Sequence, residues 1–322
     1  MNILTQDVDR DIVSMAGTID LSPDVSMVEA ATRDLVPSLK SSADLVPVDE
    51  ETDRVDLYRA RLRKTAPRVA ELADEVSRLF GNGTMAAVAP SLGLESQPLE
   101  AQRHVLFALS HLLGAPTATG PRDRRVLWDV KVRAATSGQF TTFSEDDSEA
   151  KLHTDNGFSA DPEPIFFLYV VRAARCGGGM SYFANGWRIR DRLMQSSGGR
   201  DALALLRQAP VRFRVPPVFC HDADIPEYNA ATVFAECPKM RFRQDVILRG
   251  LDANPAPGNN EIRDAVNLVT DAALAVRTTS RTLPTGSIAF VDNHDALHGR
   301  SRFSDAERHL IRVRIETRPL RH

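Results

Sequence analysis

Near its C-terminal end the chain reads Arg308-His309-Leu310-Ile311-Arg312-Val313-Arg314-Ile315. Polar and apolar residues alternate from Ile311 onward, and successive side chains of an extended strand point to opposite faces. The apolar residues of this run therefore share one face of a predicted strand, while Arg308, Arg312 and Arg314 share the other. A surface strand would show the same alternation, so the arginines indicate a binding site only if other residues do so as well.

The chain around this run, from residue 125 onward, has the pattern of β-structure. Short apolar or alternating runs are separated by Gly, Pro and Asp, and helical stretches interrupt them near 187–207 and 259–276. A parallel sheet would require strict alternation of strands and helices, so the pattern favours an antiparallel jelly roll. The expected strands are 126–132, 165–171, 181–183, 211–215, 288–291 and 310–315.

The preceding part of the chain shows helical periodicity instead. Apolar residues recur at spacings of three and four within 53–80 and 98–113, which predicts two amphipathic helical regions. Pro67 suits the first turn of a helix, and Gly81-Asn82-Gly83 suits a helix end. We expect residues 1–50 to form an irregular arm or an early strand.

These segments predict a single domain over residues 1–322 that is mainly β with flanking helices. Residues 1–124 are expected to form an N-terminal arm and a helical layer, and residues 125–322 a jelly-roll core with helical insertions. His104 and His111 lie seven residues apart on the second helical region. We interpret them as surface or packing residues.

Composition narrows the class of protein. Lys and Arg number 40 against 43 Asp and Glu, and this near-balance argues against a broad nucleic-acid surface. The three cysteines are odd in number and widely spaced, so no disulfide framework is expected. The simpler interpretation is that the protein resides in a reducing compartment. There is no secretory pattern at the N-terminus and no apolar run near the roughly 18 residues of a membrane span. We therefore expect a soluble cytoplasmic protein without a membrane partner; the oligomeric state is left open.

The segment Leu152-His153-Thr154-Asp155-Asn156 offers two metal-binding side chains. If it is extended, His153 and Asp155 point to the same face and Thr154 points to the other. An isolated His-x-Asp is usually a surface pair, so a metal site requires a third ligand from elsewhere in the chain. Two histidines and one carboxylate on one side of a metal suit non-haem Fe(II), which needs open positions on its other side.

The third ligand is expected in the segment Phe290-Val291-Asp292-Asn293-His294-Asp295-Ala296-Leu297-His298-Gly299-Arg300, where a strand runs into a turn that carries histidines. It offers two candidates, His298 and, four residues earlier, His294. A further candidate, His221-Asp222-Ala223-Asp224, lies in a Pro-rich stretch and is interpreted as a loop. The arginines that follow His298 could bind a carboxylate of a small molecule beside such a metal, because guanidinium binds carboxylates bidentately.

Residues from about 125 to 318 resemble the taurine dioxygenase and clavaminate synthase-like family of Fe(II)/2-oxoglutarate oxygenases. The matching motifs occur in the same order: His153-Thr154-Asp155, Gly178-Gly179-Met180-Ser181-Tyr182-Phe183, Asp292-Asn293-His294, His298-Gly299-Arg300 and Arg308-His309-Leu310-Ile311-Arg312. The resemblance implies a double-stranded β-helix, which is a jelly roll, with His153, Asp155 and His298 as iron ligands. It places the ligand histidine in the His-Gly-Arg triplet.

The resemblance also implies the reaction and its co-substrates. Fe(II), O₂ and 2-oxoglutarate would be used to hydroxylate an unactivated C–H bond, with desaturation, cyclisation or epoxidation as variants, and 2-oxoglutarate would leave as succinate and CO₂. Arg308 would hold the distal carboxylate of 2-oxoglutarate, with help from the Ser181 hydroxyl; Arg312 is the alternative anchor. Retention of the carboxylate Asp155 implies oxygenation, because the related halogenases have a small residue at that position.

The prediction about the substrate rests on Arg312. It shares a strand face with Arg308, and a buried guanidinium needs an anionic partner. The resemblance implies that this partner is an acidic group of the substrate, and an internal salt bridge with Glu145-Asp146-Asp147 is the competing interpretation. We therefore expect a small acid, such as an amino acid or a peptide-like intermediate of specialised metabolism. A zinc hydrolase that uses the same three ligands and a non-catalytic β-barrel binding protein are the alternatives.

Overall fold

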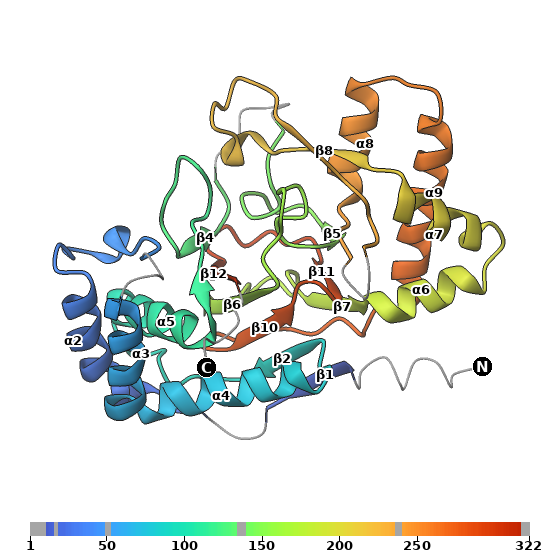
Figure 1. Ribbon diagram of the computed structural model, residues 1–322. Coiled ribbons are helices and arrows are strands. Elements are labelled where there is room, and N and C mark those ends of the chain that lie inside the picture. Colours follow the sequence, from blue (N-terminus) through green and yellow to red (C-terminus); the bar gives the residue numbers. More distant parts are fainter. Residues whose placement is uncertain (1–10, 16–18, 49–52, 134–139, 236–239, 317–322) are drawn as a thin grey trace.

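Two β-sheets face each other, and a group of helices covers the outer face of each sheet (Figure 1). The computed structural model describes residues 11–15, 19–48, 53–133, 140–235 and 240–316. The layers therefore follow the order helices, larger sheet, smaller sheet, helices. This arrangement confirms the jelly-roll core with flanking helices.

The larger sheet is built around β12 (His309–Glu316), the strand that contains the alternating residues from Ile311 onward. It pairs antiparallel with β6 (Ile165–Arg172), which pairs in turn with β10 (Ile288–Asp292). The remaining strands of the sheet are β1 (Ile12–Ser14), β2 (Ala86–Ala89), β3 (Ala115–Pro116) and β4 (Trp128–Val130). Ile311, Val313 and Ile315 of β12 lie in the core that the sheet shares with the helices, as the alternation predicted.

The smaller sheet has the order β5-β11-β7, and all its pairings are antiparallel. Its strands are β5 (Ala150–His153), β7 (Ser181–Asn185) and β11 (Ala296–Arg300). Phe183 of this sheet packs with Phe166 and Val170 of the larger one, so an apolar layer joins the two sheets. A two-stranded ribbon of β8 (Val211–Arg214) and β9 (Tyr228–Ala231) lies outside both sheets.

The first helical group packs against the larger sheet. It consists of α2 (Val25–Leu35), α3 (Asp53–Thr65), α4 (Pro67–Gly81) and α5 (Leu99–Leu113), with the short 3₁₀ helices η2 (Ser22–Asp24) and η3 (Ser42–Asp44). The predicted helical regions are confirmed, and Pro67 is the first residue of α4. The interpretation of 1–50 as an arm or early strand holds for β1 but is wrong for α2, whose Val25, Val28 and Leu35 are buried. Residues 1–10 lie outside the described part of the chain.

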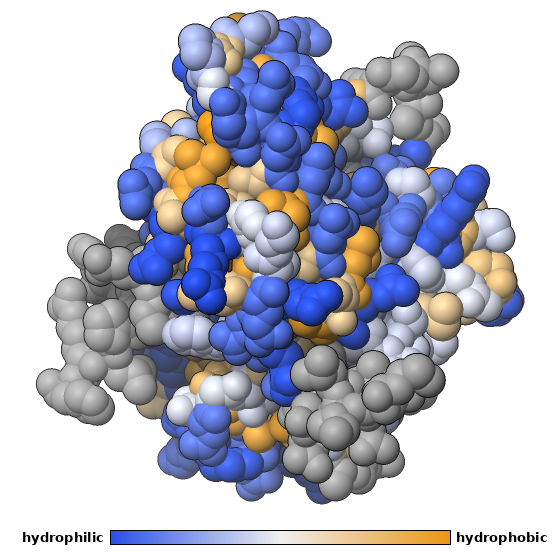
Figure 2. All heavy atoms as spheres, turned by 90° about the vertical axis from the view of Figure 1, so that its right-hand side faces the viewer, coloured by the Kyte–Doolittle hydropathy of each residue, from blue (hydrophilic) through white to orange (hydrophobic). Residues whose placement is uncertain are grey.

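The second helical group covers the smaller sheet and comes from the insertions. It consists of α6 (Gly186–Met194), α7 (Gly199–Gln208), α8 (Gln244–Ala253) and α9 (Asn259–Ala275), with the 3₁₀ helix η4 (Pro217–Phe219). The helical stretches near 187–207 and 259–276 are confirmed; α8 was not expected. Figure 2 shows the face that these helices present, where hydrophobic residues lie among hydrophilic ones, as on an ordinary solvent-facing surface.

The remaining predictions about the fold concern the first 124 residues, two histidines, the cysteines and membrane-spanning helices. β1, β2 and β3 come from residues before 125 and join the larger sheet, so the first 124 residues supply strands as well as helices. His104 and His111 are buried packing residues of α5. Cys176 and Cys220 are free, and Cys237 lies outside the described residues. Within the described ranges, no helix is both long enough and apolar enough to cross a membrane.

The packing of the first helical group gives a testable stability difference. Phe107 on α5 is fully buried, and the centroid of its ring lies 4.6 Å from the centroid of the His111 ring. Phe107→Ala should lower the free energy of unfolding by about 3–5 kcal/mol through lost burial and a residual cavity. Leu57→Ala, at a residue of α3 that is 69% exposed, should change it by less than about 0.5 kcal/mol. Equal urea midpoints for the two variants would contradict this packing.

Candidate active site

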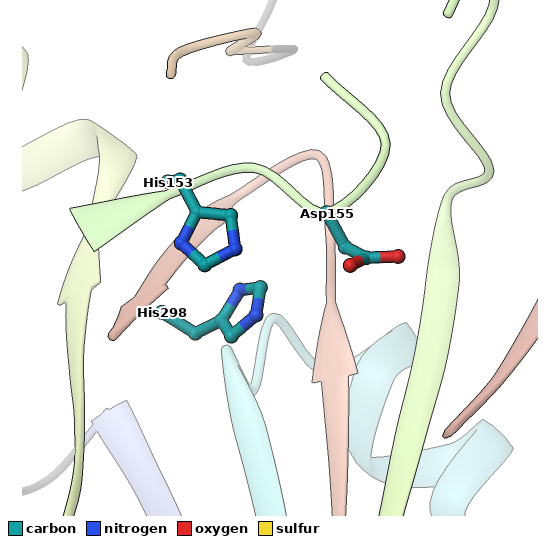
Figure 3. Close-up of side chains that lie close together, drawn as sticks. All are labelled: His153, Asp155 and His298. Atoms are coloured by element: carbon teal, nitrogen blue, oxygen red, sulfur yellow. The ribbon is translucent and has the colours of Figure 1, made fainter. Parts of the chain in front are cut away.

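His153 and His298 are brought together by strand pairing. His153 ends β5 and His298 lies in β11, where the two residues are direct antiparallel partners. Their ring centroids are 4.2 Å apart, and Figure 3 shows the rings close together with the Asp155 carboxylate to one side. Cross-strand partners on one face are within side-chain reach, so register alone sets this pair.

The surroundings of His153 leave one of its nitrogens available. Its Nδ1 lies 2.7 Å from the carbonyl oxygen of Lys151, which can only accept, so Nδ1 carries the proton and Nε2 keeps its lone pair. Burial and the neighbouring His298 hold the pKa of His153 well below its ordinary value. Burial lowers the pKa of His298 to about 4. Both imidazoles are therefore neutral at pH 7, the form that binds metal.

The segment is not extended through Asp155, in contrast to the arrangement considered from the sequence. β5 ends at His153, and Asp155 lies in the turn that follows, before Asn156 with its positive φ of 54°. Thr154 does point to the opposite side. Its Oγ1 donates to the Met240 carbonyl at 3.1 Å and accepts from the Phe242 N–H at 3.0 Å. The strand register thus fixes His153, whereas other contacts fix Asp155.

Two arginines of β12 hold the Asp155 carboxylate. Arg312 Nη1 donates to Oδ1 and Arg314 Nε donates to Oδ2, each at 2.8 Å. Burial alone would raise the pKa of Asp155, but the two guanidinium groups outweigh it, and the pKa lies below its ordinary value. Asp155 is therefore ionised at neutral pH despite being buried.

The three proposed ligands form a compact group. One ligand atom from each of His153, Asp155 and His298 lies within 4.8 Å of the others, and this is the one such group of His, Cys, Asp and Glu in the described ranges. His294 lies elsewhere, with Nε2 2.9 Å from the Pro162 carbonyl. His221 is 82% exposed in its side chain and pairs with Glu227, in agreement with its interpretation as a loop residue.

Arg308 lines the same cavity as the two histidines, together with Ser181. Its guanidinium lies over the ring of Phe303, 4.9 Å from the centroid, and it makes no hydrogen bond to a described residue. Burial and the nearby Arg300 lower the pKa of Arg308 to about 9, so it remains charged at pH 7. Gly179, at a φ of 72°, keeps this space open, since a Cβ there would lie 3.0 Å from Arg308 Nε.

Arg312 forms an internal salt bridge, as the competing interpretation held, but not with the run 145–147. Its partner is Asp155, as described above, and the internal salt bridge is thus with a proposed ligand. Arg312 nevertheless lines the cavity, and its Nη2 is buried without a hydrogen bond among the described residues. The guanidinium therefore still has a donor to offer.

Two features of the His-Gly-Arg triplet have structural causes. A Cβ on Gly299 would lie 2.2 Å from Tyr182 Cε2, so only glycine permits the approach of that ring. Arg300 donates to the carbonyl oxygens of Phe143, Asp146 and Ser148 and so holds that loop against β11. Sequence patterns gave Arg300 no role, because its acceptors are backbone oxygens.

Sequence reasoning also missed Asn293 and Arg314, which contact Asp155 directly, and Glu163, whose Oε1 lies 3.9 Å from Arg314 Nη1. Glu163 accepts from Thr117 Oγ1 at 2.7 Å and from Asn156 Nδ2 at 2.9 Å. The alternation of β12 had placed Arg314 beside Arg312, and that was the available signal for it. Asn293 was part of a recognised motif, but nothing in the pattern gave its contacts.

The donor set fits Fe(II) and 2-oxoglutarate. His298 Nδ1 is buried without a hydrogen bond among the described residues, as expected of a nitrogen whose partner is added later. Two neutral imidazoles and one carboxylate within reach of one point are the donor types that non-haem iron prefers. The cavity lies between the two sheets, because residues of both line it.

Comparison with known proteins agrees with this geometry. A solved structure described as asparagine oxygenase in complex with Fe(II), 2S,3S-3-hydroxyasparagine and succinate superposes with a TM-score of 0.67 over 96% of this chain and 94% of that one, at 19% identity. The non-heme iron oxygenase OrfP in complex with Fe and alpha-ketoglutaric acid gives a TM-score of 0.64 over 95% and 94%, at 16% identity. No curated protein sequence matches the chain.

The fold and the site therefore define a non-haem iron oxygenase that depends on 2-oxoglutarate. The family model described as taurine catabolism dioxygenase TauD, TfdA family, matches residues 92–314, and the chain belongs to this family. The expected family, enzyme class and cofactors are thereby confirmed. The zinc hydrolase and the non-catalytic binding protein are set aside.

The choice between the two histidines can be tested by metal binding alone. His298→Ala should weaken anaerobic binding of Fe(II) by more than the roughly 10- to 100-fold typical of losing a residue that only orients a ligand. His294→Ala is the matched control and should bind Fe(II) like the unmodified protein. The reverse result in an equilibrium titration would contradict the geometry of the site.

Proposed function

We propose that this enzyme hydroxylates an unactivated C–H bond of a small substrate that carries a carboxylate, an amino acid or a peptide-like intermediate of specialised metabolism. His153, Asp155 and His298 hold Fe(II) in this proposal. The metal, when bound with 2-oxoglutarate and O₂, supplies the oxidising chemistry. The protein supplies binding, orientation and charge.

Arg308 is the observation that carries the co-substrate assignment. It is a buried, charged guanidinium without an acceptor among the described residues, and it lies in the cavity that contains both histidines. A buried unpaired charge is costly, so an anion is expected there. The distal carboxylate of 2-oxoglutarate suits it, and the Ser181 hydroxyl in the same cavity can donate to that carboxylate.

The charge of the cavity supports an acidic substrate. Its charged lining residues are one acid, Asp155, and three arginines, Arg300, Arg308 and Arg312. Fe(II) adds further positive charge, and 2-oxoglutarate, a dianion, does not by itself offset all of it. A carboxylate on the substrate would bring the site closer to neutrality, with the unused Nη2 of Arg312 as its donor.

The structural neighbours are consistent with an amino-acid substrate. The asparagine oxygenase contains hydroxyasparagine, and OrfP has been solved with Fe, succinate and (3S)-hydroxy-L-Arg. Both are free amino acids with an α-carboxylate. Oxidation of such a substrate would release succinate in proportion to product, so a screen of amino acids for substrate-triggered succinate formation tests the proposed class. Succinate release with uncharged compounds alone would contradict it.

The role of Arg308 predicts a specific binding defect. Arg308→Ala should weaken 2-oxoglutarate binding to the anaerobic Fe(II) protein by about 10- to 100-fold, since a charge-assisted hydrogen bond contributes about 1.5–3 kcal/mol. Ser181→Ala should show a smaller effect. Arg172→Ala, which removes an arginine paired with Glu307 at the surface, is the control and should bind normally. Normal binding by Arg308→Ala with a defect in Arg312→Ala would exchange the two roles.

The role of Arg312 predicts a defect confined to the substrate. Arg312→Lys keeps the charge but loses the planar fork that can hold Asp155 and a second carboxylate together. At saturating Fe(II), the variant should bind 2-oxoglutarate normally and bind the acidic substrate at least about tenfold more weakly. Isothermal titration with each ligand separates the two effects. Unchanged substrate affinity would contradict the proposed contact.

A further inference from the structure

Asp155 lies where the strand ladder no longer holds the chain. Its neighbour in the metal group, His153, is the last residue of β5, and Asp155 falls in the turn beyond it. A ligand in a turn has more freedom than one in a paired strand, because no neighbouring backbone fixes its position. Something outside β5 must therefore keep its carboxylate at a constant place beside the two histidines.

Asn293 takes the place of the missing strand partner. It follows β10 directly and is 1% exposed. Its Oδ1 accepts from the Asp155 N–H at 2.8 Å, and its Nδ2 donates to the Asp155 carbonyl at 3.0 Å. The side chain thus pairs with both polar groups of one residue's backbone, as a neighbouring strand does.

Asn293 is itself held firmly. Its second Nδ2 hydrogen reaches the Glu163 carbonyl at 2.7 Å, and its backbone N–H donates to the Pro164 carbonyl at 2.7 Å. Both amide donors and the amide oxygen are therefore used. Aspartate could not replace it, because a carboxylate has no hydrogen to donate to the two carbonyl oxygens.

We propose that Asn293 is a positioning residue, which fixes the backbone of Asp155 so that its carboxylate meets the metal. Asn293 does not line the cavity, and its polar atoms are occupied, so it acts through Asp155. β10 anchors the backbone of Asp155 in this way, while Arg312 and Arg314 of β12 hold its carboxylate. The inference rests on the proposed role of Asp155 as an iron ligand.

Metal affinity, measured without turnover, tests this inference. Co(II) is titrated into the metal-free protein and followed by visible absorption. Asn293→Ala and Asn293→Asp should each bind Co(II) about 10- to 100-fold more weakly, which is the usual effect of losing a residue that orients a ligand. Thr32→Val is the matched control, because it also removes buried side-chain hydrogen bonds, one to Val28 and one to Tyr58 of the helical layer. Its Co(II) affinity should be unchanged.

A double variant separates positioning from general loosening of the protein. In the Asp155→Ala background, Asn293→Ala should cause no further loss of Co(II) affinity, because the group that it positions is gone. The same loss in both backgrounds, or normal affinity of Asn293→Ala alone, would overturn the inference. If Asn293→Ala does not fold, Asn293→Asp, which keeps an acceptor at the same reach for the Asp155 N–H, takes its place in both backgrounds with the same expected result. Equal affinity of Asp155→Ala and the unmodified protein would instead overturn the ligand assignment itself.

Discussion

The site depends on one constraint: the Asp155 carboxylate must stay charged although it is buried. An isolated carboxylate would take up a proton at such a position, because burial disfavours its charged form. The guanidinium groups of Arg312 and Arg314 prevent this by binding one oxygen each. Both arginines are buried as well, so neither side of this ion-pair cluster would be stable alone. The result is an anionic side chain beside two neutral histidines.

The architecture explains why one strand serves both the fold and the chemistry. β12 lies inside the larger sheet, between β6 and its partners β3 and β4. One face contributes Ile311, Val313 and Ile315 to the core beneath the first helical group, and the other turns its arginines toward the smaller sheet. Its central position fixes these arginines relative to β5 and β11. A cationic cavity between the sheets follows directly from the alternation of this strand.

Local patterns predicted much of this, and long-range contacts account for what they missed. The alternation of β12 and the periodicity of α4 and α5 depend on neighbours in the sequence, and these elements formed as expected. His298 could be favoured because it belongs to a motif. The partner of Arg312 could not be predicted, because Asp155 is 157 residues away and comes close only after both sheets form. The contacts of Asn293 were hidden for the same reason. Helix α2 is different, because its buried Val25, Val28 and Leu35 recur at helical spacings of three and seven, so its signal was local and was overlooked.

The central claim is that one cavity holds Fe(II) on His153, Asp155 and His298 with 2-oxoglutarate directed at Arg308. The most direct measurement is an anaerobic crystal structure with Fe(II) and 2-oxoglutarate, with anomalous scattering to locate the iron. The account predicts a single iron peak in contact with these three side chains, and the distal carboxylate of 2-oxoglutarate hydrogen-bonded to Arg308. An iron peak at another group of residues, or a 2-oxoglutarate whose distal carboxylate lies away from Arg308, would contradict it.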